Sequence, residues 1–163
     1  MALAPVPTGL SPFHPAVLLA TWGWSGRLPG PKGTWGSAAA LPFGWLIAWA
    51  AGPLALIPAA LLVFAVGIWA GGLYASKLGV GDPGPVVIDE VAGQWLTLAL
   101  VPLDPLLWIA GFFLFRAADI VKPFPANWAD RSLKGGIGIM TDDLIAGLYA
   151  MLVLWGAHRW LMS

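Results

Sequence analysis

Carboxylates stand in adjacent pairs at two places in a chain that is otherwise strongly apolar. Asp89 and Glu90 belong to the stretch DPGPVVIDEVAGQW, whose prolines keep the chain out of a helix until just before the acids, and Asp142 and Asp143 repeat the pairing after the segment GGIG. Each pair is predicted to open a helix. The helix dipole favours charge there, but it offsets only part of the cost of desolvating two adjacent carboxylates. The repetition therefore favours a functional site over simple helix-end charge.

Further charged residues lie near these pairs in the sequence. Arg116 and Asp119 share a face of one predicted helix, and Lys122 follows three residues later, just before Pro123 ends it. An ion pair within the helix accounts for Arg116 and Asp119 by itself. The next loop adds Asp130, Arg131 and Lys134. They stand beside the Gly-rich segment, whose N–H groups could form an anion-binding nest.

These residue types suit a hard cation and a phosphate. The chain has no Cys, and its two His residues, His14 and His158, stand far from the acids in sequence and are predicted to be interfacial. Oxygen ligands without imidazole or thiolate are typical of Mg²⁺, which is commonly shared between one or two carboxylates and a substrate phosphate. The set predicts Mg²⁺-dependent phosphate chemistry, with Lys and Arg neutralising the charge that develops. Attack by an activated water and an aspartyl-phosphate intermediate both stay open.

Long apolar runs must position these residues. Of the 163 residues, 59% are hydrophobic and 10% are charged, a balance that excludes an ordinary soluble domain. We therefore predict an all-α integral membrane protein with a single domain, residues 1–163. About five membrane helices are expected, over Ser37–Ala51, Pro53–Ser76, Asp89–Val101, Pro105–Val121 and Asp142–Leu161. The shorter stretch Phe13–Trp24 is too short to cross a bilayer and predicts an interfacial or re-entrant helix.

The charges are distributed unevenly over that arrangement. If the chain crosses the membrane with each helix, every Lys, Arg, Asp and Glu except Asp104 and Arg159 falls on or near one side. The positive-inside rule makes that side cytoplasmic, whereas acidic residues contribute little to the rule and need another explanation. Lys plus Arg equal Asp plus Glu at 8 each, which gives no reason to expect nucleic acid as a partner. The N-terminus has no basic segment before its first apolar run, so no cleaved signal peptide is expected.

Three segments resemble a known family. DPGPVVIDEVAGQW and the later run FRAADIVKPFPANWADRSLKGGIGIMTDDLIAGLYA resemble phosphatidylglycerophosphatase A, a bacterial family that removes the terminal phosphate of phosphatidylglycerophosphate to make phosphatidylglycerol. The upstream PKGTWGS is similar to the family's Pro-Gly-Thr-x-Gly-Ser element, so the resemblance runs from about Gly23 to Ala150. It implies a Mg²⁺-dependent lipid phosphomonoesterase in the bacterial inner membrane, multi-pass, with membrane lipids around it and its active site facing the cytoplasm.

The resemblance carries over residue by residue. The positions that match the family's motifs are Asp89, Glu90, Asp119, Lys122, Asp130, Arg131, Asp142 and Asp143. Metal binding and water activation are expected from Asp89, Glu90, Asp142 and Asp143, because pairs on two separate helix starts can converge. Asp119 is expected to act as a ligand or general base. The expected substrate-binding residues are Thr34, Lys122, Asp130 and Arg131. Apolar flanks between the helices would receive the acyl chains.

Two alternatives from the residues themselves stay open. A small ion-coupled transporter would use the acidic cluster as its ion site, although transport sites lie near the membrane midplane and these carboxylates stand at helix ends. An alcohol phosphatidyltransferase also uses carboxylate-bound metal, but its Asp-Gly-x-x-Ala-Arg run is absent. A His-based lipid phosphatase is not expected. The sequence indicates no oligomeric state.

Overall fold

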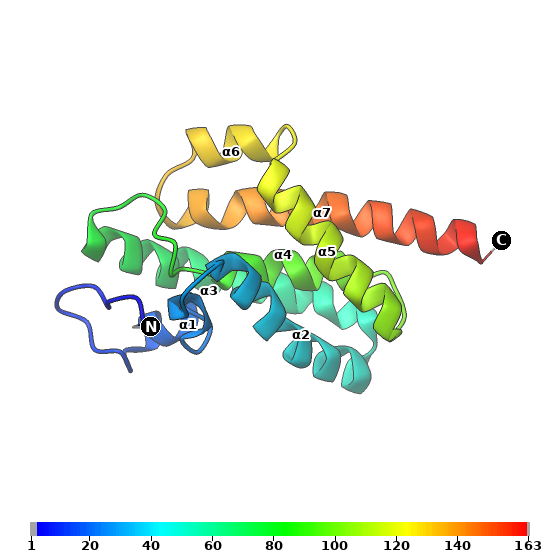
Figure 1. The fold of residues 1–163 in the computed structure, drawn as a ribbon, viewed down its shortest axis with the longest axis horizontal. Coiled ribbons are helices and arrows are strands. Elements are labelled where there is room, and N and C mark those ends of the chain that lie inside the picture. Colours follow the sequence, from blue (N-terminus) through cyan, green and yellow to red (C-terminus); the bar gives the residue numbers. More distant parts are fainter. Residues whose placement is uncertain (1–2, 163) are drawn as a thin grey trace.

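The computed structural model describes residues 3–162, and all regular structure within that range is helical. In chain order the elements are α1 (Pro15–Ala20), η1 (Ser25–Arg27), α2 (Lys32–Ala51), η2 (Pro53–Ala55), α3 (Leu56–Leu78), α4 (Ile88–Leu98), α5 (Pro105–Val121), α6 (Ala126–Ser132) and α7 (Gly135–Leu161), where η marks a 3-10 helix. Figure 1 shows α3, α4 and α7 running along the molecule, with α2 and α5 across one end and α6 above the start of α7. The predicted all-α class is confirmed.

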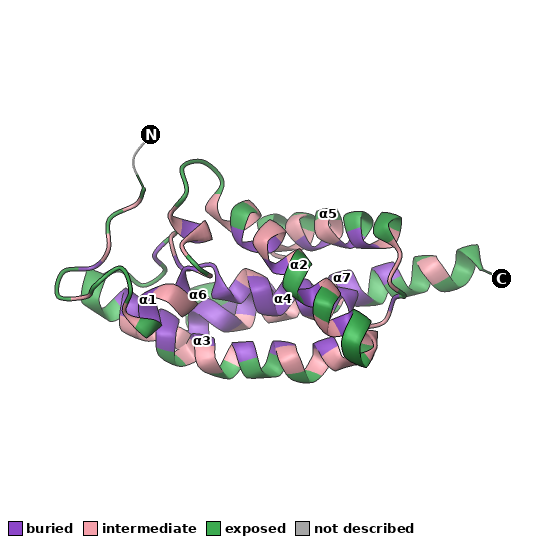
Figure 2. Ribbon diagram, turned by 90° about the horizontal axis from the view of Figure 1, so that it is seen from below, coloured by how far each residue is buried: buried purple, intermediate pink, exposed green. Residues whose placement is uncertain are grey.

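The centre of the bundle is formed by α4 and α7. Helix α4 packs against α2, α3, α5 and α7, and α7 packs in addition against α3, α5 and α6. Nearly every residue of α4 is buried, and in Figure 2 α4 is almost entirely purple while the outer helices carry exposed faces. Polar side chains at the start of α4 are therefore enclosed by neighbouring helices.

Glycines allow α4 and α7 to lie very close together. A Cβ atom placed on Gly147 of α7 would lie 2.8 Å from the Cα atom of Gly93 in α4. The hydroxyl of Thr97 lies 2.9 Å from the carbonyl oxygen of Gly93 and 3.3 Å from that of Gly147, which joins the two helices at the same level. Each glycine stands four residues, or about one helical turn, after an acid: Gly93 after Asp89 and Gly147 after Asp143. The crossing therefore sets how close those two acids can come.

The substitution Gly147→Ala is expected to lower the free energy of unfolding by about 1–3 kcal/mol, because the added methyl group must push α4 and α7 apart. Gly156→Ala, in the same helix, is the matched control: nothing lies within 4 Å of a Cβ atom there, so Ala should stabilise by up to about 1 kcal/mol. Thermal unfolding of both variants in detergent measures the difference. Equal unfolding temperatures would contradict a close α4–α7 contact.

Helix α7 begins earlier than its sequence predicts. The expected start at Asp142 is wrong: α7 begins at Gly135, and Asp142 and Asp143 lie about two turns inside it. The expected loop of glycines is helical because α7 packs here on α3, where a Cβ atom on Gly136 would overlap the carbonyl oxygen of Ile68. The glycines thus permit a close helix contact instead of a flexible connection.

The other boundaries agree more closely with expectation. Helix α5 has the predicted bounds, α2 begins at Lys32 instead of Ser37, and α4 spans Ile88–Leu98. The predicted helix from Pro53 is η2 followed by α3. Residues 126–132 were expected to be a loop and instead form α6, whose buried residues Ala126 and Ala129 lie on a helix that packs against α7. Within Phe13–Trp24 only α1 is an α-helix, and it packs on α3.

Two helical segments are long and apolar enough to cross a membrane, Pro53–Leu78 and Gly135–Leu161. The first is mostly open to the surroundings, whereas about half of the second is buried inside the bundle. Large apolar side chains are exposed along the outer faces of the helices, among them Trp49, Leu62, Leu106, Phe113 and Val153. An outer surface of this kind is typical of a protein that is surrounded by lipid.

Candidate metal and phosphate site

The connection between α3 and α4 fixes the first pair of acids. The N–H of Val86 donates to the carbonyl oxygen of Pro83 at 2.8 Å, and the N–H of Val87 donates to that of Ala20 at 2.8 Å, so the chain is tethered to the end of α1 just before α4. Asp89 and Glu90 then fall in the first turn of α4. The Asp89 carboxylate accepts a hydrogen bond from the Glu90 N–H at 3.1 Å and so takes up one of the unpaired N–H groups of that turn.

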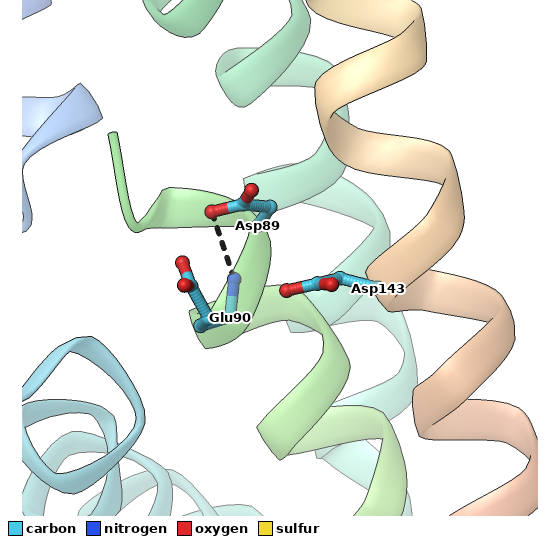
Figure 3. Close-up of side chains that lie close together, drawn as sticks. All are labelled: Asp89, Glu90 and Asp143. Carbon is cyan, nitrogen blue, oxygen red and sulfur yellow. Dashed lines mark hydrogen bonds between the residues drawn. The ribbon is translucent and has the colours of Figure 1, made fainter. Parts of the chain in front are cut away.

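Three carboxylates from two helices converge here (Figure 3). One oxygen each from Asp89, Glu90 and Asp143 can be chosen so that all lie within 4.8 Å of one another. The residues Asp89 and Asp143 are only 8% and 4% exposed. Like charges so close and so little hydrated repel strongly. Moreover, Glu90 Oε2 is buried and has no hydrogen-bond partner among the described residues. The oxygen-only donors and the unpartnered Glu90 atom both fit a bound divalent cation.

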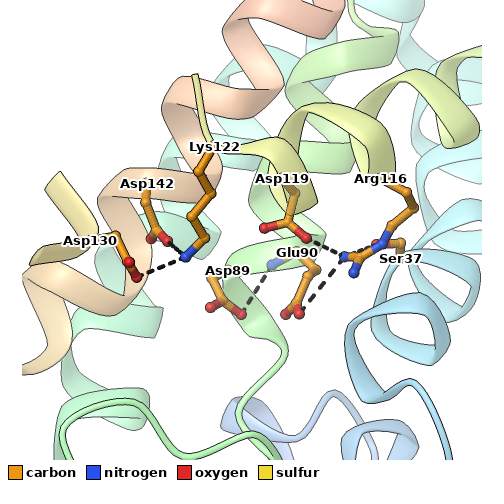
Figure 4. A network of polar contacts seen from close by, with 8 residues as sticks. All are labelled: Ser37, Asp89, Glu90, Arg116, Asp119, Lys122, Asp130 and Asp142. Carbon is orange, nitrogen blue, oxygen red and sulfur yellow. Dashed lines mark hydrogen bonds and ion pairs between the residues drawn. The ribbon is translucent and has the colours of Figure 1, made fainter. Parts of the chain in front are cut away.

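Arg116 of α5 closes one side of the acid cluster, as Figure 4 shows. Its Nη1 atom lies 2.9 Å from Asp119 Oδ2, 3.9 Å from Glu90 Oε1 and 3.4 Å from the hydroxyl of Ser37. The predicted pairing of Arg116 with Asp119 is confirmed, and Arg116 also reaches α4 and α2. Gly33 makes this possible, because a Cβ atom there would overlap Glu90 Oε1 and crowd the Arg116 guanidinium.

Lys122 closes the other side. Its Nζ donates to Asp142 Oδ2 at 2.6 Å and to Asp130 Oδ1 at 2.7 Å, linking the end of α5 to α7 and α6. Lys122 ends α5 in the left-handed conformation, with φ +47°, which is unfavourable for a residue with a Cβ atom. Burial lowers the pKa of Lys122, but the hydrogen bonds to the two carboxylates outweigh it and raise the pKa above its usual value. The ammonium group is therefore charged throughout the neutral range.

Two cavities meet at these residues. The first, of about 430 Å³, is lined by Gly30, Lys32, Gly33, Asp82, Gly84, Val86, Asp89, Glu90, Arg116, Asp119, Lys122, Asp142 and Asp143. The second, of about 450 Å³, is lined by Gly81, Asp82, Asp130, Arg131, Leu133, Lys134, Gly135, Gly138, Ile139 and Asp142. They share Asp82 and Asp142. We call the first the polar cavity, since it holds the acid cluster.

The polar cavity gathers most of the residues predicted from the sequence. Asp89, Glu90, Asp119, Lys122, Asp142 and Asp143 line it, Asp130 and Arg131 line the second cavity, and Thr34 lines neither. Asp142 is buried but lies outside the three-residue cluster. Consecutive residues of a helix point about 100° apart. Asp143 accordingly lies in the cluster with the acids of α4, while Asp142 is paired with Lys122.

Four residues gain a place that the sequence did not assign to them. Lys32, Asp82 and Arg116 line the polar cavity. Gln94 is fully buried one turn after Glu90, and neither of its amide atoms has a partner among the described residues. Arg116 had a sufficient explanation in its ion pair with Asp119. Lys32 precedes the predicted helix start at Ser37. Because α2 in fact begins at Lys32, this residue belongs to the helix and lines the polar cavity.

Comparison with known proteins gives a consistent result. The family described as phosphatidylglycerophosphatase A matches residues 18–158. The protein of that name from Escherichia coli K12 is 38% identical over 152 residues, which cover 92% of this chain and 86% of the relative. The one from Haemophilus influenzae is 36% identical over 154 residues, covering 94% of this chain and 93% of the relative.

A third relative bears a different name. A protein of Bacteroides thetaiotaomicron, provisionally named a phosphatidylinositol-3-phosphatase, is 39% identical over 160 residues, covering 90% of this chain and 95% of the relative. No solved structure matches the chain.

Proposed function

Because the chain belongs to the phosphatidylglycerophosphatase A family, and so is a phosphatase, we propose that it removes the terminal phosphate of phosphatidylglycerophosphate to give phosphatidylglycerol. The observation that carries the proposal is the polar cavity, in which three converging carboxylates face the cations Lys32, Arg116 and Lys122. A phosphate monoester carries about two negative charges at neutral pH, and this arrangement supplies both metal ligands and counter-charges for it.

The proposed cofactor is Mg²⁺, held by Asp89, Glu90 and Asp143, with the second oxygen of Asp142 as a further ligand. The oxygen-only ligand set and the unpartnered Glu90 oxygen support this choice. When bound, Mg²⁺ would polarise the phosphoryl oxygens and lower the pKa of a bound water. We propose this role for Mg²⁺ because a magnesium ion commonly shares its coordination between carboxylates and a substrate phosphate.

The remaining residues would bind the phosphate and direct the attacking group. Lys122 is charged and anchored by Asp130 and Asp142, so it presents a fixed positive charge at the cavity wall. Arg116 neutralises charge that develops on the phosphoryl oxygens, and Asp119 holds its guanidinium in place at 2.9 Å or accepts a proton from the nucleophile. Arg131 and Thr34 are proposed to contact the head group outside the polar cavity.

We propose that the chain is one multi-pass domain of the bacterial inner membrane with about five crossings and its active site on the cytoplasmic face. The two long apolar helices and the exposed apolar side chains support a membrane location. With five crossings, every Lys and Arg except Arg159 would fall on the side that carries the acids, and the positive-inside rule would make that side cytoplasmic. The comparisons lend no support to an ion-coupled transporter.

Phosphate release tests the proposal. The purified, detergent-solubilised chain is given phosphatidylglycerophosphate with Mg²⁺ or with a chelator, beside phosphatidic acid and phosphatidylinositol 3-phosphate as alternative substrates. We expect release from phosphatidylglycerophosphate that falls to background with chelator and returns when Mg²⁺ is added in excess. No release from folded protein would contradict the proposal, and preference for the inositol lipid would move the chain to the substrate named for the Bacteroides relative.

A further inference from the structure

An apolar groove lies on two of the helices that flank the polar cavity. Helix α2 contributes Lys32 and Gly33 to the polar cavity, and α5 contributes Arg116 and Asp119. Farther along both helices, a groove of about 360 Å³ is lined only by apolar residues, namely Ala38, Leu41, Pro42, Trp45, Trp108 and Ile109. We call it the α2–α5 groove. The same two helices thus line part of the charged cavity at one end and the whole apolar groove farther along.

Contacts at both ends hold α2 and α5 in antiparallel register. At the polar end the Arg116 guanidinium lies 3.4 Å from the Ser37 hydroxyl. At the apolar end the rings of Trp45 and Trp108 meet edge to face, with centroids 5.0 Å apart. The two contacts are eight residues apart on each helix, or about 12 Å along the axis. The groove lies between them, beginning at Ala38, directly after Ser37.

The open side of the groove faces the outer apolar surface. Ile109 at its edge is 54% exposed, and exposed apolar residues continue on both helices, such as Phe43 and Leu46 on α2 and Phe113 on α5. A chain that entered from this side would meet no charged side chain before Arg116. The groove therefore opens to the surface suited to lipid, and its polar end lies next to Ser37 and Arg116, the second of which lines the polar cavity.

We propose that the α2–α5 groove holds an acyl chain of the lipid substrate while the head group occupies the polar cavity. The inference rests on the proposed function, since it assigns the position of the lipid part of that substrate. Helices α2 and α5 would then contribute both to the head-group site, which α4 and α7 complete, and to the acyl-chain site. The lipid substrate would reach the polar cavity by moving sideways within the membrane, so its acyl chains would not have to leave the apolar layer.

A second apolar groove is less well placed for this role. It has about 260 Å³ and lies between α5 and α7, where it is lined by Leu114, Ala117, Ala118, Val121, Pro123, Ala150 and Val153. Phe115 and Ala146, which are 0% and 1% exposed, form a small apolar core with Ala150 on the same two helices. Close packing thus fills the space between α5 and α7 beside this groove. At the polar end of the α2–α5 groove, by contrast, the small Ser37 contacts Arg116, which itself lines the polar cavity.

Filling the groove tests the inference. Leu41→Trp and Ala38→Phe add bulk inside it, and Leu46→Trp adds the same bulk to α2 at a residue that is 59% exposed and outside the groove. Each variant is assayed with long-chain phosphatidylglycerophosphate and with its deacylated, water-soluble head group. We expect the two groove variants to lose up to about 10²-fold in kcat/KM for the long-chain lipid, because a misplaced head group costs that much. Turnover of the deacylated head group should stay within twofold of the unaltered chain.

The outcomes separate the inference from the proposed function. Phosphate release by the unaltered chain reports on the function alone. Equal losses for both substrates would mean that the groove residues act by supporting the polar cavity, and no loss for either would mean that the chain binds elsewhere. Both results overturn the inference, as does an equal loss in Leu46→Trp.

Crosslinking gives a readout that does not depend on turnover. Phosphatidylglycerophosphate with a photoreactive group in one acyl chain is expected to label residues 38–45 and 105–112, and excess deacylated head group should reduce that labelling. Labelling that the head group does not reduce would mean ordinary surrounding lipid. Crosslinks from a photoreactive residue at position 109 to a second copy of the chain would mean a protein interface. Either result would overturn the proposal.

Discussion

Replacing Asp89 by Asn is expected to abolish phosphate release while the protein stays folded. The substitution keeps the shape of the side chain but removes one of three negative charges whose oxygens lie within 4.8 Å of one another. Cation affinity should fall with it, and removing even one preorganised hydrogen-bond donor commonly costs about 10²- to 10³-fold in kcat. Loss of a metal ligand in this cluster should cost at least as much.

The Asp89→Asn substitution should not lower thermal stability, although it abolishes activity. Without a metal ion the Asn variant should unfold at the same or a higher temperature than the unaltered chain, because repulsion between buried carboxylates is reduced. Added Mg²⁺ should raise the unfolding temperature of the unaltered chain and raise that of the variant much less. Thermal unfolding with Mg²⁺ and with chelator measures both effects.

Asp104→Asn is the matched control for this substitution. Asp104 also stands at the start of a helix, where its carboxylate accepts the Leu107 N–H at 2.9 Å, and Asn caps helices equally well. It does not line the polar cavity. Normal activity is expected in this variant. A fully active Asp89→Asn protein would remove Asp89 from the proposed site.

Lys122→Met is expected to lower kcat/KM by about 10²-fold, the scale of loss that follows removal of one positioned hydrogen-bond donor. Met keeps the length of the side chain, but the link from α5 to Asp130 and Asp142 is lost. Asp142 is 6% exposed and would be left as a charge without its cationic partner. Phosphate release and the affinity for inorganic phosphate as a product inhibitor measure the effect.

The pH dependence gives a further check on Lys122. Because its pKa is raised by the two carboxylates, the ammonium group stays charged at every pH below its ordinary value, and its ion pairs are lost only as the pH rises through the raised value. No loss of activity between neutral and mildly alkaline pH should therefore be caused by deprotonation of Lys122.

Lys77→Met is the control for Lys122→Met. Lys77 is an exposed residue in the last turn of α3, and its replacement should leave kcat/KM unchanged. A similar loss in both variants would contradict a specific role.

The sequence predicts the helical class and the bounds of α5 because long apolar runs between prolines leave few alternatives. It also predicts that the two acid pairs, Asp89–Glu90 and Asp142–Asp143, converge, because adjacent carboxylates are costly to bury. In the structure Asp143 joins Asp89 and Glu90, whereas Asp142 pairs with Lys122. The sequence does not predict the start of α7. A run of glycines is a poor helix former in isolation, and only the packing of Gly136 against Ile68 on α3 gives those glycines a helical role.

The sequence also does not predict that Asp143 joins the acids of α4 while Asp142 pairs with Lys122. Both belong to one motif, but their directions depend on where α7 begins and on which helices lie beside it. Helix α6 has only seven residues, too few for a clear periodic pattern, so its contribution of Asp130 to Lys122 could not be anticipated as a structural contact. The contacts of Arg116 with Glu90 and Ser37 were not predicted, because an ion pair with Asp119 already accounted for its charge.

The central position of α7 has a consequence for biosynthesis. Helix α7 follows all the other helices in the chain, yet it packs against α3, α4, α5 and α6. During translation the acids of α4 therefore remain without Asp143 and without the α4–α7 glycine contact until α7 has been synthesised. A nascent chain that stops before α7 lacks both the core of its bundle and one of the three clustered carboxylates. We expect such a chain to be degraded by proteases and to show no phosphate release.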